Sequence, residues 1–167
     1  MATPQSPAQE LQGQHRGHEV ISQILARLIE LTEHQLDVWM PTMEPRIFNS
    51  SPVVEALSHF AARHPRNRAR ILIERPNQVR NANPRLLETC RRFSDFLQIR
   101  CAAEEHRGHS EGYIVVDKVH LVMMPDITRA EIAVKTDART DATQVLHRFQ
   151  PAWDHGEAAK GIYTLGL

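Results

Sequence analysis

The sequence predicts a single α/β domain with a mixed, mostly parallel sheet flanked by helices on both faces. Three observations predict it. Helical and strand-like segments alternate through the first two thirds of the chain, an order typical of parallel sheets with helical crossovers. The run RARILIE at 68–74 has three consecutive large aliphatic residues, which indicates a strand covered on both faces. Two further runs, 113–116 and 119–124, flank a polar dipeptide and predict a hairpin near the centre of the sheet.

The other elements follow from spacing and caps. Residues 18–34 place aliphatic side chains three and four positions apart, as an amphipathic helix does. Ser51 and Asn83 each precede a proline and look like helix N-caps, so helices are expected to begin there. The remaining expected elements are strands at 35–40, 97–101 and 130–135, loops at 41–50, 75–83 and 102–111, and a closing helix at 141–153.

The ends of the chain lack such patterns. Residues 1–16 are rich in Pro, Gln, Ala and Ser and are expected to form a disordered tail, followed by the domain at 17–156 and a second tail at 157–167. No secretory signal pattern or membrane-spanning apolar run is visible, and the two cysteines, Cys90 and Cys101, are too few for a disulfide framework. A cytoplasmic protein that does not bind membranes is expected.

Positive charge is concentrated in the middle of the chain, although the whole sequence is neutral. Between positions 63 and 107 there are eleven arginines and five acidic residues, a net charge of +6. The planar guanidinium suits phosphate and carboxylate recognition, whereas a solvated basic face without a ligand would give the same pattern. The candidate phosphate- or partner-binding residues are Arg75, Arg80, Arg91, Arg92 and Arg107.

From about Glu19 to Trp153 the chain resembles a single domain of the phospholipase D-like superfamily. The order of elements carries the resemblance, together with the segments YIVVD, VHLVMM, EIAVKTD and RFQPAW. It is similar to bacterial single-domain members of that group. In active members a motif H-x-K-x4-D leads into the central strand: the histidine attacks phosphorus, the lysine holds the phosphate oxygens, and two copies face each other. The resemblance therefore implies a homodimer.

Alignment on Asp117 places Ser110 at the histidine position and Gly112 at the lysine position. Both reacting groups are then absent, so the resemblance implies a catalytically inactive binding or adaptor module without a cofactor. Its partner would be an RNA or DNA backbone or an acidic protein. Because only 5% of the residues are aromatic, contacts to the backbone are expected rather than base stacking. Asp117 itself is expected to cap the hairpin turn.

The alternative is a divergent phosphodiesterase or nuclease that uses His106 or His109 across a homodimer. His109 lies one residue from the motif position, and a shift of one residue turns a strand side chain to the opposite face unless a bulge intervenes. Cys101, His106, His109 and His120 lie within one short span and are of the residue types that bind zinc. Their spacing fits no closed zinc motif, so no metal site is expected.

Overall fold

One sheet of eight strands forms the centre of this computed structural model, which describes residues 5–159, 161 and 162. The strands lie in the order β1-β7-β6-β5-β2-β3-β4-β8. Their bounds are β1 (Gly13–Arg16), β2 (Gln35–Trp39), β3 (Arg68–Ile73), β4 (Leu97–Cys101), β5 (Gly112–Val116), β6 (His120–Met124), β7 (Glu131–Lys135) and β8 (Glu157–Ala158).

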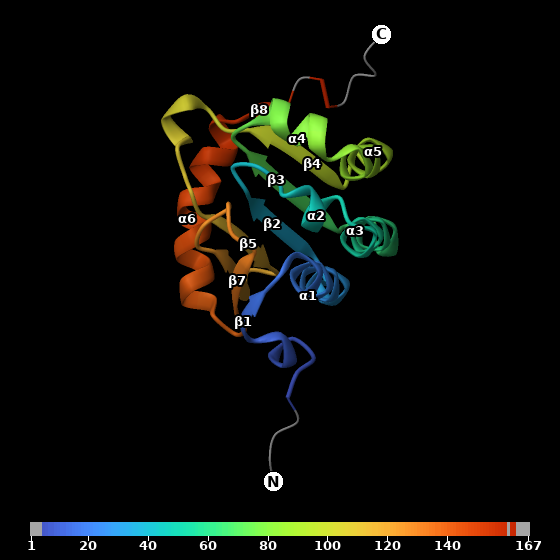
Figure 1. Cartoon of the computed structure of the whole chain (residues 1–167), viewed down its shortest axis with the longest axis vertical. Helices are drawn as coiled ribbons and strands as arrows, with labels where there is room; N and C mark the ends of the chain where they lie inside the picture. Colours follow the sequence, from blue (N-terminus) through green and yellow to red (C-terminus); the bar gives the residue numbers. More distant parts are fainter. Residues whose placement is uncertain (1–4, 160, 163–167) are drawn as a thin grey trace.

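Helices cover both faces of this sheet, as predicted. In the described part of the chain, α1, α3 and α5 lie on one side with the shorter α2 and α4, and α6 lies on the other (Figure 1). The helices are α1 (His18–Leu31), α2 (Pro45–Phe48), α3 (Ser51–Arg63), α4 (Pro76–Ala82), α5 (Pro84–Arg92) and α6 (Arg139–His155), with 3-10 turns η1 (Gln9–Leu11) and η2 (Glu104–His106). The expected α/β class is confirmed.

Strand directions differ in one respect from the prediction, because parallel pairing is not the majority. β2, β3 and β4 are parallel, which the helical crossovers between them require. The other five pairings are antiparallel. The three residues at 117–119 are too few to connect parallel strands, so the β5–β6 hairpin cannot extend the parallel part. β5 enters the sheet beside β2 in the opposite direction.

Side chains alternate between the two faces along each strand. Val38, Ile71 and Ile114 lie in one row on the face beneath α1 and α3 and belong to the main core. The aliphatic residues at 18–34 form α1, whose buried side bears Ile21, Leu25 and other apolar residues. These contacts confirm the amphipathic helix that the spacing predicts.

The opposite face contains a buried ion pair. Asp37 of β2 accepts a hydrogen bond from Nε of Arg70 of β3 at 2.6 Å, and 1% and 19% of their side chains are exposed. The Arg70 guanidinium also lies over the Phe149 ring of α6, 4.9 Å from its centroid. This pair therefore joins the parallel strands to α6.

We expect Arg70→Leu to lower the free energy of unfolding by about 3–5 kcal/mol, because it leaves the Asp37 carboxylate buried without its cation. Urea unfolding followed by circular dichroism measures this. The matched control is Arg16→Leu, which removes an exposed pair with Glu131 at 3.6 Å and should cost less than about 1 kcal/mol. Equal losses for the two variants would contradict the assignment.

The predicted hairpin is present, but the role expected for Asp117 is not. Asp117 and Lys118 have φ values of 53° and 61°, as the tight turn requires. The Asp117 carboxylate accepts hydrogen bonds from the backbone N–H groups of Glu33, His34 and Gln35 at 2.8, 2.8 and 2.9 Å. It thus caps the connection between α1 and β2 and anchors the hairpin to it, rather than capping its own turn.

Both expected tails contribute strands where they are described. Residues 13–16 form β1, paired with β7, and residues 157–158 form β8, paired with β4. Disorder over 1–16 is therefore wrong for β1, because an edge strand needs no apolar pattern to pair its backbone; residues 1–4, 160 and 163–167 lie outside the described part. The loop expected at 75–83 contains α4, which buries Val79.

Candidate functional site

The ends of β2, β3 and β4 meet the start of β5 at one edge of the sheet. This follows because β5 runs antiparallel to β2, so residues that precede β5 lie beside those that follow the parallel strands. Trp39 ends β2, Glu74 follows β3, and His109 precedes β5. We call this the carboxyl edge. In open α/β sheets ligands collect at such an edge.

Glu74 is the centre of the carboxyl edge. Its side chain is 4% exposed, and its Oε1 accepts hydrogen bonds from the backbone N–H groups of Gly108 at 2.6 Å and His109 at 3.3 Å. Its Oε2 lies 3.3 Å from Nε1 of Trp39, which donates to it, and 3.0 Å from Nδ1 of His109. Because an ionised carboxylate can only accept hydrogen bonds, Nδ1 of His109 is the donor in this contact. Nε2 is then the ring nitrogen that Glu74 does not engage.

The chain reaches this geometry through a glycine. Gly108 has φ of 98°, a conformation that other residues rarely adopt, and it directs two successive N–H groups at one carboxylate. The His109 ring then packs edge-on against Trp39 with centroids 4.9 Å apart. The imidazole, 30% exposed, is therefore held in one orientation.

The two motif positions, 110 and 112, do not take part in this network around Glu74. A Cβ atom on Gly112 would lie 2.2 Å from Sδ and 2.9 Å from Cε of Met40, which is 1% exposed in the main core. Met40 thus occupies the space that a side chain at position 112 would enter. Ser110 is exposed, and its carbonyl accepts a hydrogen bond from the N–H of Ile127.

His109 and Gly112 face opposite sides of the sheet. His109 contacts Trp39, which packs with Phe149 and Trp153 of α6, whereas Gly112 contacts Met40 beneath the helices of the other face. His109, one residue from motif position 110, is expected to face the opposite side of the sheet from the motif positions. The structure shows this arrangement.

Three of the five candidate arginines lie near the carboxyl edge. Arg75 and Arg80 are exposed on and beside α4, and Arg80 donates to Oδ1 of Asn77 at 3.2 Å. Arg107 donates through Nε to the carbonyl of Ala102 at 2.6 Å. The structure does not bring the other two to this group: Arg91 donates to the carbonyl of Ile162, and Arg92 lies over the Phe93 ring at the end of α5.

The four residues considered as zinc ligands do not converge. His109 is bound to Glu74, His120 lies by the hairpin where its Nδ1 accepts from the N–H of Asp137, and Cys101 contacts Arg107. His106 instead meets His155, with Glu105 close by. The residues that the sequence interpretation missed are Trp39, Glu74 and His155; an acidic residue directly after a buried strand was the available signal for Glu74.

The other cysteine is unsuited to chemistry. Cys90 of α5 is fully buried, and this burial raises the pKa of its thiol to about 12. A thiol that stays neutral in the core is a poor nucleophile and a poor metal ligand. Cys90 is therefore a packing residue.

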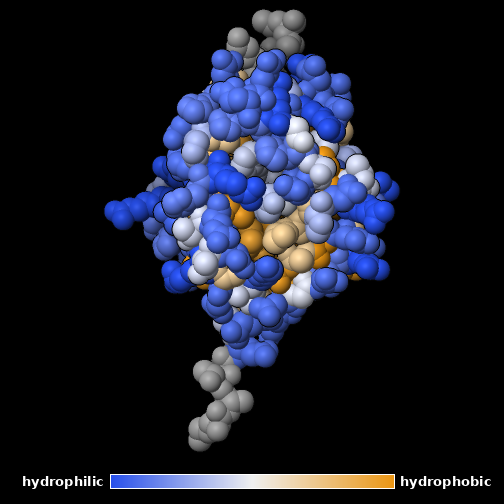
Figure 2. Space-filling model, turned by 90° about the vertical axis from the view of Figure 1, so that its left-hand side faces the viewer, coloured by the Kyte–Doolittle hydropathy of each residue, from blue (hydrophilic) through white to orange (hydrophobic). Residues whose placement is uncertain are grey.

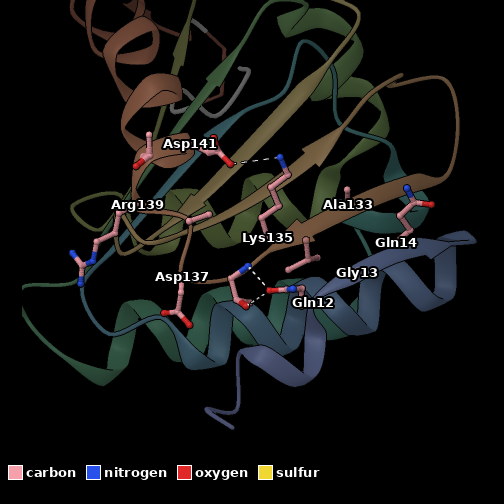
Figure 3. A pocket seen from close by; sticks show the side chains of 12 residues that line it. Gln12, Gly13, Gln14, Ala133, Lys135, Asp137, Arg139 and Asp141 are labelled. Carbon is pink, nitrogen blue, oxygen red and sulfur yellow. Dashed lines mark hydrogen bonds and ion pairs between the residues drawn. The ribbon is translucent and has the colours of Figure 1, made fainter.

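A hollow of about 700 Å³ lies away from the carboxyl edge, at the opposite ends of the strands, between β1, β7 and the start of α6 (Figure 3). Its polar side chains bond to one another: Nζ of Lys135 lies 3.5 Å from Oδ2 of Asp141, and Gln12 accepts from Thr136 at 2.6 Å. Asp137 and Arg139 add one charge of each sign. Because these groups pair internally, we assign the candidate site to the carboxyl edge.

The molecular surface offers few apolar groups. The side that α6 covers is mainly hydrophilic with a small apolar area near its middle (Figure 2). Among the described residues, Val20 is the exposed large hydrophobic one, at 49%. Within the same part of the chain, each helix is too short or too polar to cross a membrane.

Residues 17–165 match the family described as Domain of unknown function (DUF7931). This chain belongs to that family. No curated protein matches it. The DUF7931 match covers all of the helices and every strand except β1.

Solved structures show which fold the DUF7931 domain has. It is similar to Nuc from Salmonella typhimurium, a phospholipase D family member, with a TM-score of 0.62 and 15% identity over 81% of this chain and 88% of that one. NucT from Helicobacter pylori gives 0.60 and 10%, over 84% and 92%. TrmBL2, an archaeal chromatin protein whose structure shows a novel mode of DNA binding, gives 0.59 and 11%, over 87% and 52%. The domain has the phospholipase D-like fold, as the resemblance implies.

We expect Gly112→Ala to lower the free energy of unfolding by about 1–3 kcal/mol, because the added methyl group displaces Met40 from a packed core. Met40→Ala alone should cost about 2–5 kcal/mol by leaving a cavity. In the double variant, Gly112→Ala should cost less than it does alone, because Met40→Ala has already removed the side chain with which the new methyl group clashes. Additive losses in urea unfolding would contradict the contact.

Proposed function

We propose that this domain is a catalytically inactive phospholipase D-like module that binds the phosphate backbone of nucleic acid at its carboxyl edge. The observation that carries the inactive part of the proposal is the close packing of Met40 against Gly112. In active relatives the lysine expected at this position holds the phosphate oxygens. Here the position has no side chain, and its space is filled by a buried methionine.

The separation of His109 from position 112 supports the same conclusion. Phosphoryl transfer through histidine needs an imidazole at phosphorus and a cation on the phosphate oxygens at the same time. His109 lies on the α6 side, and position 112 lies on the other. A cation introduced at 112 would therefore not face the imidazole.

Binding to phosphate is supported by the exposed cations that remain. Arg75 and Arg80 are exposed near the carboxyl edge, and Arg107 is exposed within the loop that holds His109. Glu104 and Glu105 lie in the same loop and oppose this charge. The binding should therefore be weak and should depend steeply on salt. The DNA-binding relative TrmBL2 supports nucleic acid over an acidic protein as the partner.

Fluorescence anisotropy with labelled single-stranded DNA, RNA and duplex DNA at 50 and 200 mM salt tests this. We expect Arg75→Gln and Arg80→Gln each to weaken binding to all sequences and to lower the slope of log K against log salt by about 1. The control is Arg66→Gln, an exposed arginine just before β3 at the opposite edge. Absent or salt-independent binding, or equal effects of the three variants, would contradict the proposal and leave an acidic protein as the partner.

A divergent phosphodiesterase is the second candidate, and the His109–Glu74 contact favours it. Nε2 of His109 would attack phosphorus and release an alcohol, and water would then hydrolyse the phosphohistidine. We place His109 rather than His106 in this role, because His106 contacts His155 instead of Glu74.

For the leading proposal we expect bis(p-nitrophenyl) phosphate to be hydrolysed no faster by the protein than by buffer, because position 112, where active relatives are expected to have the lysine, has no side chain. The second candidate requires activity that falls at least about 100-fold in His109→Ala and is kept in His147→Ala, an exposed histidine on α6. Circular dichroism would establish that both variants fold. That pattern would overturn the assignment of an inactive domain. A homodimer and a cytoplasmic location remain predictions.

A further inference from the structure

We infer that Glu105, His106 and His155 form a binding site for a divalent transition-metal ion of the zinc type. One ligand atom from each residue lies within 4.8 Å of the others. Glu105 and His106 belong to η2, and His155 is the last residue of α6. Two imidazoles and a carboxylate are a ligand set that zinc uses in proteins, with a fourth position for water.

The histidine pair has nearly the spacing that a metal needs. Nε2 of His106 lies 3.0 Å from Nδ1 of His155, and the rings are tilted by 30° with centroids 5.3 Å apart. At Zn–N distances of about 2.0–2.1 Å, tetrahedral ligand atoms lie about 3.3 Å apart. A small opening of the pair would therefore admit the ion, with the exposed Glu105 side chain turning toward it.

The two segments that carry the ligands, η2 and the end of α6, both contact the end of β4. These contacts hold the ligands near each other before any ion binds. A Cβ atom on Gly156 would lie 3.1 Å from the carbonyl oxygen of Cys101, so the end of α6 approaches β4 closely beside His155. Arg107, the residue directly after His106, donates a hydrogen bond to the carbonyl of Ala102, the residue directly after β4. Preorganised ligands lose little conformational entropy when they bind.

The charge around the site also suits a cation. His155 lines a hollow of about 460 Å³ together with Glu104 and Glu157, whose carboxylates are exposed. Arg107 lines it too, so one positive charge stands against these two carboxylates.

Metal binding would connect the loop that carries His109 to the end of α6. Gly108 and His109 follow His106 by two and three residues and hold Glu74. An ion at His106 would therefore reduce the motion of this loop. This inference is independent of the proposed function, because it rests on η2 and α6 rather than on the arginines.

Isothermal titration of EDTA-treated full-length protein with zinc chloride at neutral pH tests the site. We expect one ion per chain, at least about tenfold weaker affinity in His106→Ala and in His155→Ala, and a smaller loss in Glu105→Gln. The matched control is His147→Ala, which removes an exposed histidine eight positions earlier on α6 and should bind zinc as the unchanged protein does.

A second measurement keeps the test independent of folding defects. Zinc should raise the melting temperature of the unchanged protein and of His147→Ala, but not that of His106→Ala. If His155→Ala does not fold by circular dichroism, the two η2 variants decide the question. The inference is overturned if the protein does not bind zinc at 0.1 mM, or if His106→Ala and Glu105→Gln bind it as tightly as His147→Ala does.

Discussion

The buried Glu74 carboxylate is the interaction on which the candidate site depends. A carboxylate in the interior is costly unless hydrogen-bond donors surround it, and the donors here come from β2 and from the loop before β5. The carboxylate therefore ties that loop to the ends of the parallel strands. Gly108 permits two adjacent N–H groups to reach one oxygen atom. The orientation of His109 follows from this arrangement.

The two sides of β5 have separate roles. Its side toward α1 and α3 is core, where Met40 packs against Gly112. Its other side lies toward α6 and the aromatic cluster of Trp39, Phe149 and Trp153. A catalytic pair two residues apart on a strand would share one face. His109 and position 112 are three apart and face opposite sides of the sheet, so they do not form such a pair.

Two histidines of the same short loop have different environments. His109 is held by a buried acid, whereas His106 reaches an exposed partner on α6. The charged loop after β4 thus contacts both β3 and the end of α6. A ligand of either histidine would act on the same loop. This physical link joins the proposed phosphate-binding edge to the inferred metal site.

Local chemistry in the sequence determined most helices and strands. The spacing of aliphatic residues marks α1, and the Asp117-Lys118 dipeptide marks the hairpin. The serine–proline and asparagine–proline pairs mark the starts of α3 and α5, but the N-cap of α3 is Ser50 rather than Ser51, and the Asn83 side chain forms no capping hydrogen bond. Strand direction, the burial of Glu74 and the meeting of His106 with His155, 49 residues apart, depend on long-range pairing. Hydrophobic periodicity reports which side of an element is buried, but not which element covers it. Only the tertiary structure therefore decided which polar residues share the carboxyl edge.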